Sequence, residues 1–158
     1  MSGKVVILRG PSGSGKSVYA SNHFRPSKLV SADNFFVVDG EYKFDPSRIG
    51  MAHADCMHQF LMLLNEGAEL IVVDNTNIHI WEFINYVEAA NLAGYEIEIV
   101  EFAVKTVEAI KVCIGRNTHG VPPEVISRMA IEYEEWTSEA NYYGIAVRTI
   151  DVNKFQHL

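Results

Sequence analysis

Eight residues near the start of the chain, with the sequence GPSGSGKS, limit the possible folds more than any other feature. They match the pattern G-x-x-x-x-G-K-[ST], and they lie between an apolar run, Val5–Leu8, and a stretch that can form a helix, Ser17–Phe24. In such a context the glycines let successive backbone N–H groups point inward, and the helix adds the positive end of its dipole. The pattern therefore predicts a phosphate-binding loop. Its members are Gly10, Pro11, Ser12, Gly13, Ser14, Gly15, Lys16 and Ser17.

The last two residues of this loop indicate which molecule carries the phosphates. A lysine at the place of Lys16 reaches the β- and γ-phosphates of a nucleoside triphosphate, and a hydroxyl at the place of Ser17 ligates Mg²⁺. The alternative is a Gly/Ser turn with an incidental lysine, which the preceding strand and following helix disfavour. We therefore expect ATP and Mg²⁺ as cofactors.

The composition bounds the class of protein. The chain has 158 residues, 48% of them hydrophobic and 21% charged, which suits one globular domain over residues 1–158. No apolar run reaches about 18 residues, so we expect no membrane span. The two cysteines are too few for a disulfide framework, and the N-terminus shows no signal peptide, so we expect a cytoplasmic protein. The net charge of −7 argues against a general nucleic-acid coat protein but permits a local basic groove.

Apolar runs and helical stretches alternate along the chain, which predicts an α/β fold with an open parallel sheet and helices on both faces. The five predicted strands are Lys4–Arg9, Lys28–Ser31, Glu69–Asp74, Glu96–Phe102 and Ala146–Val152. The predicted helices are Ser17–Phe24, Ser47–Asn65, Ile80–Ala93, Thr106–Arg116 and Pro122–Trp136. We expect an irregular loop at 36–46 and a lid segment at about 115–124.

In open α/β sheets, ligands bind at the carboxyl ends of the strands. Asp74 ends an apolar strand, as the second acidic residue of P-loop enzymes does, and such an aspartate holds Mg²⁺ or its water shell beside the loop serine. The alternative is an aspartate that begins a turn. We favour the metal role, with Asn75, Thr76 and Asn77 as auxiliary groups.

Two further residues are candidates for the chemistry of phosphate transfer. Asp33, just beyond the second predicted strand, could accept the proton of an attacking hydroxyl, or it could cap a short helix. Arg116 precedes a segment with glycine and proline, where a guanidinium on a mobile loop could neutralise a transferring phosphoryl group. The alternative is an arginine that binds the last carbonyls of its helix, and we favour the lid role because the glycine and proline of the segment are typical of hinges.

A transition-metal site at His53, Cys56 and His58 is disfavoured. His53 and Cys56 share a helix face, but His58 points elsewhere, and the sequence offers no further ligands.

Several of these elements together resemble the P-loop kinase domain of bacteriophage polynucleotide kinase. The chain is similar also to the P-loop domains of Nedd4-binding-type proteins and of cyclic-nucleotide phosphodiesterase. The resemblance covers roughly residues 5–134, and its selective parts are the Asp-Asn-Thr-Asn element at 74–77 and the Arg-Asn…Val-Pro…Arg-Met element at 116–129. It implies a P-loop NTPase fold and transfer of the ATP γ-phosphate to the 5′-hydroxyl of a polynucleotide.

The resemblance also implies roles for single residues. Asp33 becomes the general base, Lys16 the phosphate clamp, Ser17 the Mg²⁺ ligand and Arg116 the lid arginine. The aspartate that matches Asp74 lies near the phosphates, where its role could be orienting rather than metal-binding.

The chain departs from the phage pattern at two places that bear on the acceptor. Phe36 stands where the phage enzyme has an arginine, three residues after the catalytic aspartate. The phage lid is more basic, whereas here only Arg116 is clear, with His119 or Arg128 as possible partners.

Three functions follow. The leading one is an ATP- and Mg²⁺-dependent kinase whose acceptor is a nucleic-acid 5′ end. The second is a nucleoside or other small-molecule kinase, favoured by the acidic net charge and by Phe35 or Phe36 as a stacking ring. The third is a non-catalytic ATP-binding module.

Overall fold

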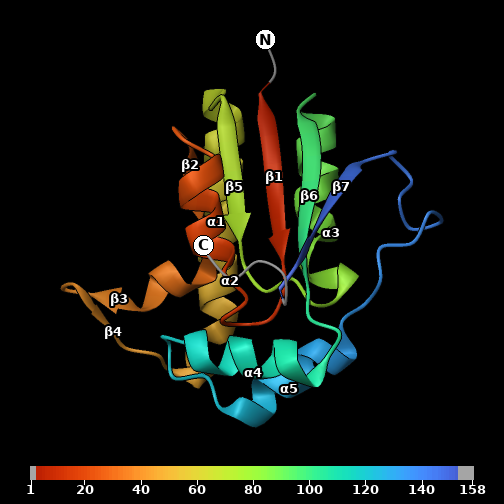
Figure 1. Ribbon diagram of the computed structural model, residues 1–158. Helices are drawn as coiled ribbons and strands as arrows, with labels where there is room; N and C mark the ends of the chain where they lie inside the picture. Colours follow the sequence, from red (N-terminus) through yellow and green to blue (C-terminus); the bar gives the residue numbers. More distant parts are fainter. Residues whose placement is uncertain (1–2, 153–158) are drawn as a thin grey trace.

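A computed structural model describes residues 3–152 and shows a parallel sheet at its centre (Figure 1). The strand order is β2-β5-β1-β6-β7, with β1 in the middle, paired with β5 and β6. The order confirms the predicted five-stranded open parallel sheet. The bounds are β1 (Lys4–Arg9), β2 (Lys28–Val30), β5 (Leu70–Asp74), β6 (Glu96–Ala103) and β7 (Ala146–Asp151).

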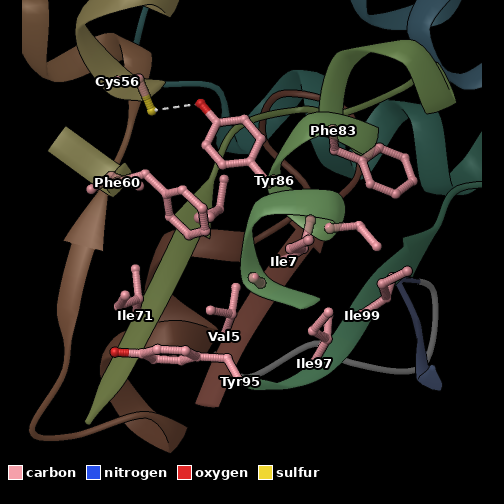
Figure 2. Close-up of a cluster of buried hydrophobic side chains, with 14 of the residues drawn as sticks. Val5, Ile7, Cys56, Phe60, Ile71, Phe83, Tyr86, Tyr95, Ile97 and Ile99 are labelled. Atoms are coloured by element: carbon pink, nitrogen blue, oxygen red, sulfur yellow. Dashed lines mark hydrogen bonds between the residues drawn. The ribbon is translucent and has the colours of Figure 1, made fainter. Parts of the chain in front are cut away.

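Helices cover both faces of the sheet, as predicted. Because successive side chains of a strand point to opposite faces, Val5 and Ile7 of β1 pack on one side and Val6 and Leu8 on the other. The first side is covered by helices α2 and α3, and Figure 2 shows its close packing around Phe60 and the other labelled side chains. The second side is covered by α1, α4 and α5. The helices are α1 (Lys16–His23), α2 (Ile49–Glu66), α3 (Ile80–Leu92), α4 (Val107–Arg116) and α5 (Pro123–Glu132).

The region predicted as an irregular loop is in fact folded. A 3₁₀ helix, η1 (Ala32–Phe36), leads into an antiparallel pair, β3 (Val37–Val38) and β4 (Glu41–Tyr42). Asp39 and Gly40 join the pair, both with positive φ, 52° and 80°. Asp-Gly is a strong signal for a two-residue hairpin turn, so the sequence contained this signal. The long helix that follows is preceded by a short 3₁₀ turn, η2 (Pro46–Arg48).

Helix α5 is shorter than the predicted 122–136 and ends at Glu132. The chain leaves the helix because Glu134 makes two long-range backbone contacts: its N–H donates to the carbonyl of Ile78, and its own carbonyl accepts from Arg9. Arg9 is fully buried between the rings of Phe83 and Tyr133. A helical register cannot predict such contacts between distant segments.

None of the helices formed within residues 3–152 is both long enough and apolar enough to cross a membrane.

Candidate functional site

The phosphate loop joins β1 to α1 at the carboxyl end of the sheet (Figure 1). The N–H of Gly10 donates to the carbonyl of Thr76 at 2.8 Å, which ties the loop to the segment after β5. Gly13 has φ of +80°, and a Cβ there would lie 2.0 Å from the carbonyl oxygen of Cys113 on α4. The loop therefore packs so closely against α4 that only glycine fits at this position.

Lys16 is buried at the first turn of α1, and its Nζ donates to the carbonyls of Gly10 and Pro11 at 2.9 and 3.0 Å. Burial lowers the pKa of Lys16, whereas the nearby carboxylates of Asp74 and Asp33 act in the opposite direction. The ammonium group is thus held against the loop, and Lys16 lines the cavity that opens there.

Ser17 and Asp74 meet directly. The Ser17 hydroxyl donates to Oδ2 of Asp74 at 2.6 Å, and Asp74, at the end of β5, is 8% exposed. Oxygen donors are the ligands that Mg²⁺ prefers, and one or two carboxylates beside substrate phosphates are its usual protein environment. The chemistry of this donor pair therefore fits the ion expected from the sequence.

A first cavity of about 440 Å³ opens above the loop. It brings the phosphate loop together with Asp33 and with the segment after α4. Its lining residues are Ser12, Gly13, Gly15, Lys16, Ser17, Val18, Asp33, Arg116, Asn117, Thr118 and His119.

Asp33 is not the cap of η1. The side chain of Ser31 takes that role by accepting from the N–H of Asp33 at 3.3 Å. The carboxylate of Asp33 instead faces two rings: the hydroxyl of Tyr42 donates to Oδ1 at 3.1 Å, and Nδ1 of His119 lies 3.4 Å from Oδ2. The capping alternative for this aspartate was therefore wrong.

The auxiliary residues after Asp74 have different tasks. Asn75 accepts from the N–H of Ala32 at 2.8 Å, which fixes the start of η1 relative to β5. Asn77 is buried and donates to the carbonyl of Leu8 at 2.8 Å, so it joins β5 to β1 beneath the loop. Asn75 and Thr76 line a cavity, whereas Asn77 lies in neither of the two cavities at the site.

A second cavity, of about 540 Å³, adjoins the first and shares Ser12, Asp33 and His119 with it. Its walls are mainly apolar, and its cationic or potentially cationic groups are Arg128, His53 and His119. The remaining lining residues are Ala32, Tyr42, Phe44, Pro46, Ile49, Asn75, Thr76, Gly120, Val121, Pro122, Val125 and Met129.

The predicted lid is the short connection between α4 and α5. Arg116 is the last residue of α4 and lines the first cavity. Asn117 shapes the turn that follows, because its side chain donates to the carbonyl of Val121 at 2.6 Å and accepts from the N–H of His119 at 3.2 Å. This turn presents His119 to Asp33.

Tyr42 is a residue that sequence reasoning missed. It lies in β4, within the region predicted to be irregular, and only the folded hairpin brings it to Asp33. Phe36, expected as a stacking ring, is 4% exposed and packs in the core. Phe35 lies under the guanidinium of Arg48 and lines neither cavity at the site.

His53, Cys56 and His58, the transition-metal site that the sequence disfavoured, have separate surroundings. Cys56 is buried and accepts from the hydroxyl of Tyr86 at 3.2 Å, a contact drawn in Figure 2. His53 points to the second cavity instead. Within residues 3–152 no group of three or more His, Cys, Asp or Glu side chains could hold a metal ion.

Comparison with known proteins places this site in context. The family model of the AAA domain matches residues 5–136. Human NEDD4-binding protein 2 is 33% identical over 137 residues, which make up 85% of this chain. The chain spans 8% of the length of that relative.

Solved structures share the fold. The structure of the Pnkp1/Rnl/Hen1 RNA repair complex matches with a TM-score of 0.65 and 21% identity, covering 83% of this chain and 44% of the other. A gluconokinase from Sinorhizobium meliloti matches with a TM-score of 0.58 and 18% identity, covering 94% of this chain and 82% of the other. The fold is that of a P-loop kinase.

Proposed function

The chain belongs to the AAA domain family, a family of P-loop proteins, and on that premise we propose that it transfers the γ-phosphate of ATP to a hydroxyl group. The acceptor that we infer is the 5′-hydroxyl of a polynucleotide. The phosphate loop binds the donor, Asp33 removes the proton of the acceptor, and Arg116 stabilises the transferring group.

One observation carries this proposal: Asp33 belongs to both cavities. The first cavity contains the phosphate loop and the second does not, apart from Ser12. A group that moves from a nucleotide in the first cavity to an acceptor in the second would cross the boundary lined by Ser12, Asp33 and His119, and Asp33 is the carboxylate at that boundary. A general base needs that position, within hydrogen-bond reach of the attacking hydroxyl.

On the donor side the side chains have distinct tasks. Lys16 would exchange its two loop carbonyls for the terminal phosphates, and Arg116, which lines the same cavity from the end of α4, would approach the same charge. Ser17 and Asp74 would hold Mg²⁺, which when bound neutralises part of the phosphate charge. Because the transition state of phosphoryl transfer is loose, positioning and charge neutralisation account for most of the catalysis.

The lining of the second cavity favours an anionic acceptor with a flat ring. Arg128, His53 and His119 supply positive or potentially positive groups, and Asp33 is the one acid among the lining residues. Tyr42 stacks on His119 with the ring centroids 4.6 Å apart, and its ring is nearly parallel to that of Phe44. Phosphates pair with the cations and nucleobases stack on such rings, which suits the end of a nucleic-acid strand. The name of the RNA repair complex agrees with this acceptor class.

A small-molecule acceptor is the second candidate. The net charge of −7 does not favour binding along a polynucleotide, and the apolar residues that line the second cavity could enclose a nucleoside. The likeness to a gluconokinase agrees with this alternative at the level of fold.

One assay separates these functions. The protein is incubated with Mg²⁺ and ATP labelled at the γ-phosphate, together with 5′-hydroxyl DNA or RNA oligonucleotides, with nucleosides, or with buffer alone. We expect label on the oligonucleotide. Label on the nucleoside alone would favour the second candidate, and binding of ATP without transfer to any acceptor would leave a non-catalytic nucleotide-binding module.

The Asp33→Asn variant tests the general base. The amide keeps the size of the side chain but cannot take a proton, so transfer should fall at least 10²-fold while ATP binding changes little. Asp39→Asn is the matched control, because it makes the same chemical change at the exposed hairpin turn. Equal transfer rates in Asp33→Asn and in the control would remove the base assignment.

A further inference from the structure

We propose that Tyr42 and His119 are positioning residues that orient the Asp33 carboxylate, and that His119 makes this orientation depend on the lid. The inference rests on the proposed function, since it assigns a role to the groups around the proposed base. Neither side chain belongs to the phosphate loop or to the residues that would hold Mg²⁺.

The contact of Tyr42 fixes one oxygen of the base. Its hydroxyl donates to Oδ1 of Asp33, and burial, together with the Asp33 carboxylate, raises the pKa of Tyr42 to about 12. The phenol therefore keeps its proton, and remains a donor, across the neutral range. The ring itself is held by Phe36 and Phe44, whose centroids lie 6.2 and 6.4 Å away.

This arrangement explains why an aromatic side chain stands at position 36. It is buried beneath the hairpin and packs against Phe35, Tyr42 and Phe44. An arginine there, as in the phage pattern, would not offer this apolar support for the tyrosine ring. The chain thus has an aromatic support for a hydrogen-bond donor to the base at the place where the phage enzyme has a charge.

His119, a residue of the lid, contacts the other carboxylate oxygen of Asp33. Its Nδ1 lies 3.4 Å from Oδ2 of Asp33, and its ring stacks on Tyr42 at an interplanar angle of 19°. His119 comes from the segment between α4 and α5, whereas Asp33 and Tyr42 come from η1 and β4. The carboxylate therefore has ring groups on both oxygens only when the lid lies against the hairpin.

The contact of Tyr42 with Oδ1 is shorter than the contact of His119 with Oδ2, and this difference indicates which oxygen is open to the acceptor. The shorter contact of Tyr42 keeps Oδ1 occupied, and the longer contact of His119 leaves a lone pair of Oδ2 open to an acceptor hydroxyl while the ring still orients the carboxylate. In the reaction the proton of the hydroxyl moves to Oδ2. The hydroxyl oxygen forms a bond to the γ-phosphorus as the bond from that phosphorus to the bridging oxygen of ADP breaks.

The experiment measures kcat, acceptor KM and ATP binding with a 5′-hydroxyl oligonucleotide and with a nucleoside. Tyr42→Phe keeps the ring stack and removes only the donor. We expect about a tenfold loss in kcat, with KM and ATP binding changed less than twofold. His119→Ala should lower kcat about threefold, and His119→Gln, whose amide can still donate, should recover most of it. Tyr142→Phe and His58→Ala, two exposed side chains away from the site, are the controls.

A second readout does not need turnover. In the nucleotide-free protein, nuclear Overhauser contacts between the rings of Tyr42 and His119 should be present, and the His119→Ala variant should melt within a few degrees of the parent. If the parent transfers phosphate but Tyr42→Phe and His119→Ala keep its kcat, or if the ring contacts are absent, the positioning role is wrong. If the parent transfers phosphate to no acceptor, the proposed function itself fails, and the positioning role falls with it.

Discussion

The two halves of the site are built in different ways. The donor half, Gly10–Ser17 with Asp74, is anchored in the buried centre of the sheet, through Thr76 and the close approach of Gly13 to α4. The acceptor half, η1 with the β3–β4 hairpin and the lid, is largely exposed apart from Ala32 and Phe36, and its parts meet through a few side-chain contacts at Asp33. In the proposed function, phosphate binding would therefore rest on backbone packing, and acceptor choice on exposed side chains that can change with little effect on the core.

The largest effect should come from the donor half. Lys16→Met removes the buried ammonium while keeping an unbranched side chain of nearly the same length. Transfer should fall on the order of 10²- to 10³-fold, because one preorganised charge at the terminal phosphates is lost. Lys111→Met, at an exposed position of α4, is the control in the same labelled-ATP assay. A transfer rate within tenfold of the parent would contradict the donor role of this loop.

A pair of glycine variants tests whether backbone packing makes the donor half rigid. Gly13→Ala combines a positive φ with a clash against Cys113, so we expect a loss of about 3 kcal/mol in the free energy of unfolding. Gly120→Ala, in the lid, has the same kind of φ but no atom within 4 Å of the added Cβ, so about 1 kcal/mol is expected. Chemical denaturation measures both, and equal losses would mean that the loop can move away from α4.

Asn75→Ala tests the hydrogen bond that connects the donor half to the acceptor half. It removes the acceptor for the N–H of Ala32, so the free energy of unfolding should fall by about 1 kcal/mol and η1 should become less ordered. Transfer should fall more than ATP binding, since the donor half is untouched. Asn34→Ala, an exposed position in η1, serves as control, and equal losses of transfer and ATP binding in Asn75→Ala would show that the halves are not separable.

The smallest effect concerns pH. The pKa of Tyr42 in the folded protein, about 12, lies above its ordinary value of 10.0, so its contribution to stability is complete below pH 10 and is lost as the pH rises toward 12. Absorbance titration of the parent against Tyr42→Phe should reveal one phenol that ionises in this window. Asp33→Asn should lower that pKa, because the carboxylate is one of its causes. If Tyr42 has the same pKa in the parent and in Asp33→Asn, the contact between Tyr42 and Asp33 is refuted.

The donor half was largely predictable. The loop pattern, the apolar strand before it and the aspartate that ends β5 are local features, and each acts through backbone geometry that the sequence encodes directly. The alternation of strands and helices likewise predicted the sheet that places Ser17 beside Asp74.

The acceptor half was less predictable. From the sequence, Asp33 could be either a general base or a helix N-cap. The structure shows that the N-cap of η1 is Ser31. Phe36 looked like a stacking ring and is core. Tyr42 carried no signal of its own, although the Asp-Gly turn that folds its hairpin could have been recognised.

The sequence by itself determined the phosphate loop, the order of strands and helices and the P-loop kinase fold, because those depend on residue spacing and on short-range backbone preferences. Only the tertiary structure decided that Tyr42 and His119, 77 positions apart, stack on each other and face one carboxylate. Contacts between distant segments depend on how the hairpin and the lid pack at the end of the sheet, and no local pattern encodes that packing.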